Sequence, residues 1–124
     1  MQETIEKAIS QEISRFEKEH LGRGPKHIDC YLMRDLLVIR LQDILTPAEQ
    51  KLAKSLPAQE GRDLLKRLRT KLIETSRPLI DAMVERATGV GVLHLHHDIS
   101  TENGEEVFVF SLSAVPDGKP EAPK

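Results

Sequence analysis

The strongest constraint on the fold is a run of four apolar residues, Leu36, Leu37, Val38 and Ile39, inside a segment with the length of a β-strand. Side chains of a strand alternate between the two faces of a sheet, so this strand is apolar on both faces. A strand of that kind needs a covering layer on each side. The chain therefore has to supply both covering layers itself, or one of them has to come from a second molecule.

A second predicted strand, residues 105–112, has the same two-sided character. Phe108, Phe110 and Leu112 fall on one face, and Val107 and Val109 fall on the other. Large exposed apolar patches are unusual on monomers. The second cover is either the first helix of the same chain or a second copy of the chain. We expect a homodimer and keep the first helix as the alternative.

Helical spacing of apolar residues predicts a first helix over residues 4–20, which Gly22 and the Gly24-Pro25 pair bring to an end. Residues 27–33 and 36–41 predict a hairpin around an Arg34-Asp35 turn. A Thr46-Pro47-Ala48-Glu49 sequence then predicts a capped helix start, with a short helix ending near residues 56–57.

A long helix is predicted over residues 58–88, with a kink at Pro78 and a stop at Gly89. Its expected buried stripe consists of Leu65, Leu68, Leu72, Leu79 and Met83. Residues 90–99 and 105–112 predict a second hairpin, joined by a turn with an Asn-Gly pair. The fold class is α+β, with the order helix, hairpin, two helices, hairpin. We expect a four-stranded, mainly antiparallel sheet with the long kinked helix on one face.

The length of 124 residues suits one domain, which we place at residues 1–114, followed by a disordered tail at 115–124. A net charge of −2 argues against duplex DNA as a partner, because such binding depends on a basic face. The single cysteine suits a reducing compartment. The sequence contains neither a signal peptide nor a transmembrane segment, so we expect a cytoplasmic protein.

The pattern that most resembles a ligand-binding site consists of His94, His96 and Asp98, because alternate residues of a strand share a face. Both imidazoles could reach one metal ion, although zinc sites take three or four ligands. His94 and His96 are therefore candidate metal ligands, against the simpler reading of a polar sheet face. No cofactor is expected.

Other polar features have simpler explanations. Gly22-Arg23-Gly24-Pro25 precedes a strand, whereas phosphate-binding glycines precede a helix, so Arg23 is at most a contact for a protein partner. The basic residues within 66–71 read as a solvated helix face, with single-stranded nucleic acid as the least favoured alternative. Cys30 reads as a small core residue. Without a recognisable catalytic motif, we expect no enzymatic activity.

Several short motifs, taken in their order, resemble the MpsC-like family. They are the Gly22-Arg23-Gly24-Pro25 turn, the Leu45-Thr46-Pro47-Ala48-Glu49 helix start, Glu60-Gly61-Arg62, Arg77-Pro78-Leu79 and His97-Asp98-Ile99-Ser100-Thr101. The resemblance implies a soluble component of a sodium-translocating, membrane-potential-generating system linked to inorganic-carbon supply. It implies no particular catalytic residues.

The leading hypothesis is therefore a non-enzymatic cytoplasmic accessory protein. It would be homodimeric, bind a membrane transport protein, and use Arg23, Val107 and Val109 as partner contacts. The alternative is a small ligand- or metal-binding regulatory domain that uses the sheet face around His94, His96 and Asp98.

Overall fold

The computed structural model describes residues 2–55 and 57–116. Its helices are α1 (Gln2–Leu21), α2 (Pro47–Ala53), α3 (Ala58–Thr75) and α4 (Arg77–Thr88). Its strands are β1 (His27–Met33), β2 (Leu36–Gln42), β3 (Val92–Ser100) and β4 (Glu105–Leu112). The predicted α+β class is confirmed, and so is the element order, except that the described residues form three helices between the two hairpins where two were predicted. Residues 117–124 of the predicted tail lie outside the described residues.

Local signals in the sequence set the element boundaries. Thr46 and Glu49 form a reciprocal capping box at the start of α2, in which the Glu49 amide donates to Thr46 Oγ1 at 3.2 Å and the Thr46 amide donates to Glu49 Oε1 at 2.9 Å. Gly89 ends α4 in the left-handed conformation, at φ 78°. Glycine adopts that conformation without a steric penalty, which explains the predicted stop.

The long helix predicted over residues 58–88 is divided into α3 and α4. Ser76 ends α3 with φ −90° and ψ 4°, and Pro78 lies at the start of α4. Proline fits the first turn of a helix, where its missing N–H has no intrahelical partner. Pro78 therefore stands at the beginning of a new helix, where the sequence predicted a kink within one.

The four strands form one sheet in the order β1-β2-β4-β3, and every neighbouring pair is antiparallel. The register places Tyr31 opposite Val38, Val38 opposite Val109, and Val109 opposite His96. One row of side chains thus crosses the whole sheet. An irregularity between Val92 and His94 interrupts the β3–β4 pairing.

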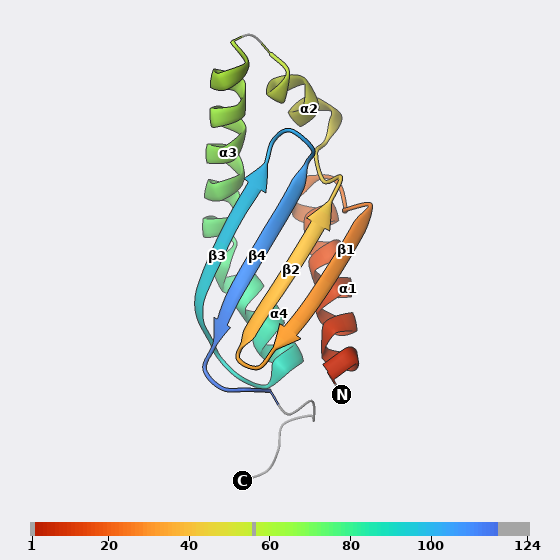
Figure 1. Cartoon of the computed structure of the whole chain (residues 1–124), viewed down its shortest axis with the longest axis vertical. Coiled ribbons are helices and arrows are strands. Elements are labelled where there is room, and N and C mark those ends of the chain that lie inside the picture. The colour runs from red at the N-terminus through yellow and green to blue at the C-terminus, as the bar shows by residue number, and fades with distance from the viewer. Residues whose placement is uncertain (1, 56, 117–124) are drawn as a thin grey trace.

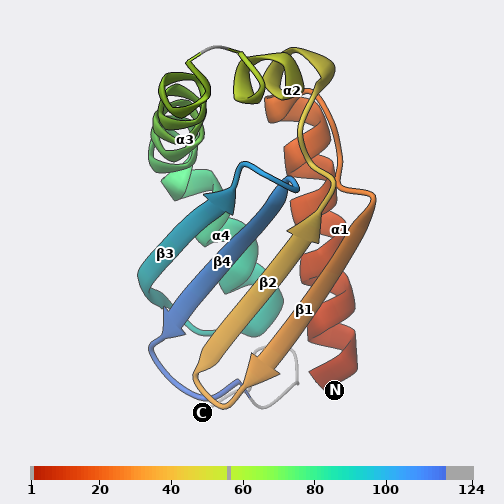
Figure 2. The same cartoon turned by 45° about the horizontal axis from the view of Figure 1, so that its top comes forward.

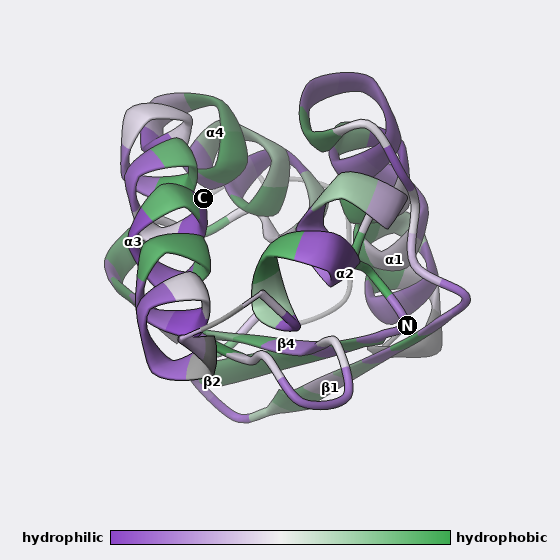
Figure 3. Ribbon diagram, turned by 90° about the horizontal axis from the view of Figure 1, so that it is seen from above, coloured by the Kyte–Doolittle hydropathy of each residue, from purple (hydrophilic) through white to green (hydrophobic). Residues whose placement is uncertain are grey.

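All the helices lie on the same side of the sheet. Figure 1 shows the four strands in front with α1, α3 and α4 behind them, and the view from above in Figure 3 shows the helices on one side. The short helix α2 lies between α1 and α3 at one end of the sheet (Figure 2). The sequence predicts a second copy of the chain as the cover of the face opposite the long helix, with the first helix as the alternative. That alternative is wrong, because α1 lies on the same side as α3 and α4. Among the described residues, no helix covers the other face.

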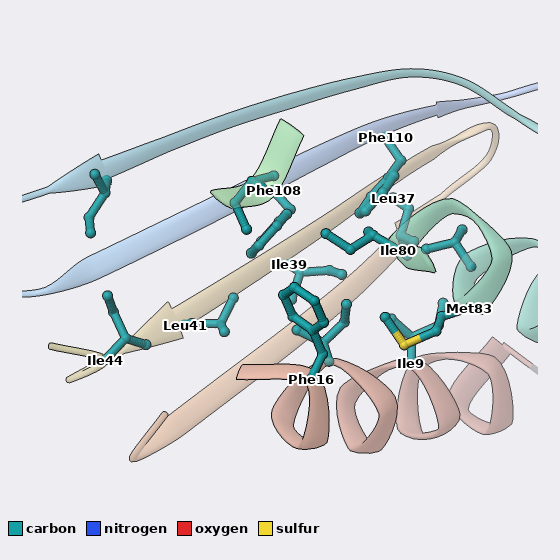
Figure 4. Close-up of a cluster of buried hydrophobic side chains, with 14 of the residues drawn as sticks. Ile9, Phe16, Leu37, Ile39, Leu41, Ile44, Ile80, Met83, Phe108 and Phe110 are labelled. Atoms are coloured by element: carbon teal, nitrogen blue, oxygen red, sulfur yellow. The ribbon is translucent and has the colours of Figure 1, made fainter. Parts of the chain in front are cut away.

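The core lies between the sheet and the helical layer. Side chains of α1, β2, α4 and β4 meet there, including Ile9, Leu37, Ile80 and Phe108 (Figure 4). Ile9 is 1% exposed and the other three are 0% exposed. At about 1.5–3 kcal/mol for each large apolar side chain, this layer is the main source of stability.

The predicted buried stripe is wrong at two positions. Leu68 is exposed because α3 buries the face that carries Leu65, Arg69 and Ile73. Leu79 is exposed because α4 buries the face that carries Ile80, Met83 and Val84. Leu93 lies at the β3 irregularity and is 57% exposed, whereas Leu95 and Ile99 face the core.

Candidate functional site

The open face of the sheet is the first candidate site, and it carries most of the residues that the sequence singled out. Its half-buried centre consists of Val38, Val107 and Val109 on the two middle strands. Tyr31 and Met33 on β1 are exposed at the edge, and Arg40 forms an ion pair with Glu105 across the same face. The face is therefore apolar in the middle and polar at its margins.

His94, His96 and Asp98 lie on this open face, exposed on the β3 edge, as the alternation predicted. The His94 and His96 ring centroids are 6.5 Å apart and the rings are inclined by 36°. Asp98 Oδ1 forms an ion pair with Lys66 Nζ at a distance of 3.2 Å. Among the described residues, no group of three or more His, Cys, Asp or Glu side chains is placed to hold a metal ion. Metal binding by the pair stays a prediction.

Arg23 lies away from the valines with which it was grouped. Its Nη1 donates to the Leu45 carbonyl at 3.2 Å, and its Nη2 contacts Asp43 Oδ2 at 3.0 Å. These bonds hold the loop after β2 against the turn that follows α1. The proposed role of Arg23 as a partner contact stays a prediction.

The second candidate site is a buried ionic cluster that the sequence reasoning missed. Arg69 on α3 is 0% exposed, and three carboxylates from different elements surround it. Its Nη1 lies 3.2 Å from Glu17 Oε1 of α1 and 3.7 Å from Glu106 Oε2 of β4. Its Nε and Nη2 donate to the two oxygens of Glu49 of α2 at 2.9 and 2.7 Å. Nη2 also donates to the Ile44 carbonyl at 3.2 Å.

The cluster holds more acid than base, and its geometry shows how the excess is accommodated. Burial, followed by the adjacent Glu106 carboxylate, raises the pKa of Glu17 well above its ordinary value. Burial also raises the pKa of Glu106, but its hydrogen bond with Glu17 works in the opposite direction. These directions favour Glu17 as the protonated member of the pair, with Glu106 as the acceptor. One proton shared by two buried carboxyl groups is the expected outcome when like charges meet in a dry site.

His97 connects this cluster to the edge of the helical layer. Its Nε2 lies 2.6 Å from Glu106 Oε2, and its ring packs on Phe108 with 4.9 Å between ring centroids. The side chain is 6% exposed, and burial lowers the pKa of His97 to about 4. The neutral imidazole consequently donates its Nε2 proton to Glu106 and leaves Nδ1 as an acceptor.

A cleft of about 360 Å³ opens beside His97, between α3, the start of α4 and β3. It is lined by Thr70, Ile73, Glu74, Arg77, Leu95 and His97. Arg77 is occupied by Asp81, whose two carboxylate oxygens are both 2.9 Å from Arg77 Nε. The cleft therefore offers two apolar side chains, a hydroxyl, a carboxylate and an imidazole.

Cys30 lies on the core side of β1, half-buried and packed against the core. Burial, followed by the charge of Glu6, raises the pKa of the Cys30 thiol to about 12. A thiol that stays protonated at neutral pH is a poor nucleophile. This agrees with the sequence-based interpretation of Cys30 as a small core residue.

The sequence does indicate that two members of the cluster, Arg69 and Glu106, face the core. Leu65, Arg69 and Ile73 recur at a spacing of four, which places Arg69 on the buried face of its helix. Glu106 alternates with Phe108 and Phe110 and therefore faces the core. What the spacing could not show is that Glu17 meets Arg69, because the two residues are 52 positions apart.

Comparison with known proteins finds a matching family and similar sequences. The sequence model of the MpsC family, described as a Na⁺-translocating membrane potential-generating system, matches residues 1–114. Two Bacillus subtilis (strain 168) proteins are similar along most of their lengths. The uncharacterized protein YbcI is 36% identical over 109 residues, which is 88% of this chain and 86% of YbcI. The uncharacterized protein YrhF is 31% identical over 112 residues, or 89% and 88%. No solved structure matches the chain.

Proposed function

Because this chain belongs to the MpsC family, we propose that it serves as a non-enzymatic, cytoplasmic accessory protein of a Na⁺-translocating, membrane potential-generating system. In this proposal the protein works by docking, and the open face of the sheet is its docking surface. The observation that carries the proposal is the half-buried apolar centre of that face, which none of the described helices covers (Figure 3). No described helix is long and apolar enough to cross a membrane.

We propose a second copy of the chain as the occupant of this face. A twofold axis parallel to the strands would place β1 of one protomer over β3 of the other. Tyr31 would then face the partner's His96, because both lie in the row that crosses the sheet. In the middle of that row, Val38 would pack against the partner's Val109, and Val109 against the partner's Val38. A hydroxyl-bearing ring over an imidazole, with apolar contacts at the centre, is a complementary pairing for an isologous interface.

Membrane association of the full-length chain tests the accessory role. We expect the protein to sediment with membranes of cells that contain the membrane subunits of the system. We also expect it to stay in the supernatant when those subunits have been deleted. Equal recovery from both membranes, or recovery from neither, would contradict the accessory role.

A further inference from the structure

A cleft of about 470 Å³ lies at the end of the sheet where α2, the first turns of α3 and the β3–β4 turn (residues 101–104) meet (Figure 2). Its apolar lining includes Leu45 and Ala53, which are both buried. The β3–β4 turn is held in place by the backbone, because the Ile44 amide donates to the Gly104 carbonyl at 3.2 Å. The cleft is therefore built from fixed parts of the fold.

Arg62 of α3 lines this cleft and has unused hydrogen-bond donors. Among the described residues, every arginine except Arg34, Arg62 and Arg67 forms an ion pair with a carboxylate. Arg34 and Arg67 are exposed, whereas Arg62 is half-buried. Its Nη2 donates to Gln59 Oε1 at 3.5 Å, which leaves most of the N–H groups of the guanidinium free to bind an acceptor within the cleft.

The other charged groups of the cleft leave an excess of positive charge. Lys54 lines the cleft and forms no ion pair with a described residue. Asp43 Oδ2 is paired with Arg23 Nη2 at 3.0 Å, so the charge of this carboxylate is balanced. Glu102, exposed on the turn, is the remaining carboxylate among the lining residues. Two cations, Lys54 and Arg62, against one carboxylate make the cleft attractive to an anion.

Four of the short motifs that resemble the MpsC-like family meet around this cleft. Leu45, Arg62 and Thr101 come from three of them and line it. Arg23 comes from a fourth and braces it, because its Nη1 donates to the Leu45 carbonyl at 3.2 Å. The open face of the sheet includes none of these four residues, so the proposed docking surface does not account for them.

We propose that this cleft binds a small phosphorylated compound, whose phosphate group contacts Arg62 and Lys54. A guanidinium can donate two parallel N–H groups to phosphate oxygens, and an ammonium group adds a second charge. A phosphate monoester carries close to two negative charges at pH 7, which suits a pair of cations better than a carboxylate does. Thr101 and Asn103 offer polar groups to the rest of the ligand, and the volume is within the range of small-molecule sites.

Titration of the isotopically labelled full-length protein by NMR at pH 7 and constant ionic strength tests the proposal, with glycerol phosphate as the probe. Glycerol is the control for the body of the ligand, and sodium lactate is the control for a single negative charge. We expect glycerol phosphate to shift the amide signals of Ala53, Asn103 and Gly104 saturably. The two controls should leave these signals in place.

Four variants locate the binding site. Arg62→Gln should weaken binding of glycerol phosphate by about tenfold, since it removes a charge-assisted contact, and Lys54→Gln should weaken it as well. Glu102→Gln should strengthen binding, because it removes a negative charge beside the phosphate. Arg67→Gln, exposed on the same helix but outside the cleft, should bind as the wild type does.

Several results would overturn the proposal. Equal shifts with lactate or glycerol would mean that the cleft does not select phosphate. Shifts that never saturate, or that Arg67→Gln reduces as much as Arg62→Gln, would mean diffuse attraction to surface cations. Weaker binding by Glu102→Gln would place the phosphate elsewhere, and a spectrum unchanged by glycerol phosphate would show that the cleft is no phosphate site.

Discussion

At the scale of single residues, Arg69 holds the layers of the protein together. Its guanidinium contacts Glu17 of α1, Glu49 of α2 and Glu106 of β4, so one side chain of α3 joins three other elements. Burying several charges is costly, and the attraction between them offsets that cost only while the set is complete. The stability of the fold therefore depends on every member of the cluster being present.

Replacing Arg69 alone would leave its carboxylates buried without a cation. We expect Arg69→Ala to lower the free energy of unfolding by about 3–5 kcal/mol, measured by urea denaturation. Arg67→Ala is the matched control, because Arg67 is exposed on the same helix. It should change stability by less than about 0.5 kcal/mol. Equal effects of the two substitutions would refute the role assigned to Arg69.

The shared proton predicts a pH dependence that Glu17→Gln should remove. The folded protein retains the Glu17 proton above the ordinary pKa of 4.5, where the unfolded chain has released it. The wild-type free energy of unfolding should thus fall relative to that of Glu17→Gln as pH rises from about 4.5, by up to about 1.4 kcal/mol per pH unit. His97, with its pKa lowered to about 4, loses stability in the opposite direction, as pH falls from 6.5. Glu17 also acts on the pKa of His97, so the Glu17 contribution is read most directly well above pH 6.5, where His97 is neutral in the folded and unfolded states of both proteins.

Denaturant titrations of both proteins at several pH values measure this difference. A stability difference that stays constant from pH 5 to pH 8 would show that Glu17 is ionised in the folded state.

At this scale, the sequence predicted orientation better than contact. Alternation placed His94 and His96 on the face where they lie, and it places Glu106 inward as well. Arg69 was assigned to a solvated basic face because its neighbours Lys66, Arg67 and Lys71 are exposed. The local sequence shows only the neighbours of a residue along the chain. It does not show the partners that folding brings together from distant positions.

At the scale of elements, Gly61 fixes how closely α3 approaches α2. A Cβ atom at this position would lie 2.1 Å from the Leu52 carbonyl oxygen and 2.6 Å from Ser55 Oγ. Backbone atoms are held by their own hydrogen bonds and cannot move aside cheaply. The Glu60-Gly61-Arg62 motif noted in the sequence thus coincides with a site of close packing.

We expect Gly61→Ala to destabilise the protein by about 1–3 kcal/mol, since it overpacks this contact. The sign is informative, because alanine at an exposed helical site would be more stable than glycine by up to about 1 kcal/mol. The thermal unfolding midpoint is a suitable measurement, with Asp63→Ala on the exposed side of α3 as the control. A midpoint for Gly61→Ala at or above that of the wild type would contradict the close approach.

Short-range signals predicted most element boundaries. The capping box, the Gly89 stop and the hairpin turns depend on a few neighbouring residues, and the structure confirms them. The division of the long helix at Ser76 was not predicted. The apolar spacing continues from α3 into α4, and proline has different consequences inside a helix and at its start.

At the scale of the whole molecule, the arrangement in layers follows from the strands that are apolar on both faces and therefore need cover on both. The helices α1, α3 and α4 all pack on one face of the sheet, leaving Val38, Val107 and Val109 at the centre of the other (Figures 1 and 3). The two-sided apolar pattern predicted that each face needs a cover. It could not specify which helix covers which face, because the side on which α1 packs depends on long-range contacts.

Val109→Lys should separate the proposed dimer, since it places a charge at the centre of the open face. Leu64→Lys is a matched control, because Leu64 is an exposed apolar residue on α3, away from that face. Both variants should unfold at temperatures close to that of the wild type. If Leu64→Lys alone dissociated the particle, the interface would lie on the helical layer.

The mass of the wild-type particle at micromolar concentration, measured by sedimentation equilibrium, tests the central claim most directly. A docking surface filled by a second copy predicts twice the chain mass of 14.0 kDa, and a return to 14.0 kDa for Val109→Lys. A wild-type protein that sediments at 14.0 kDa at every concentration tested would contradict it.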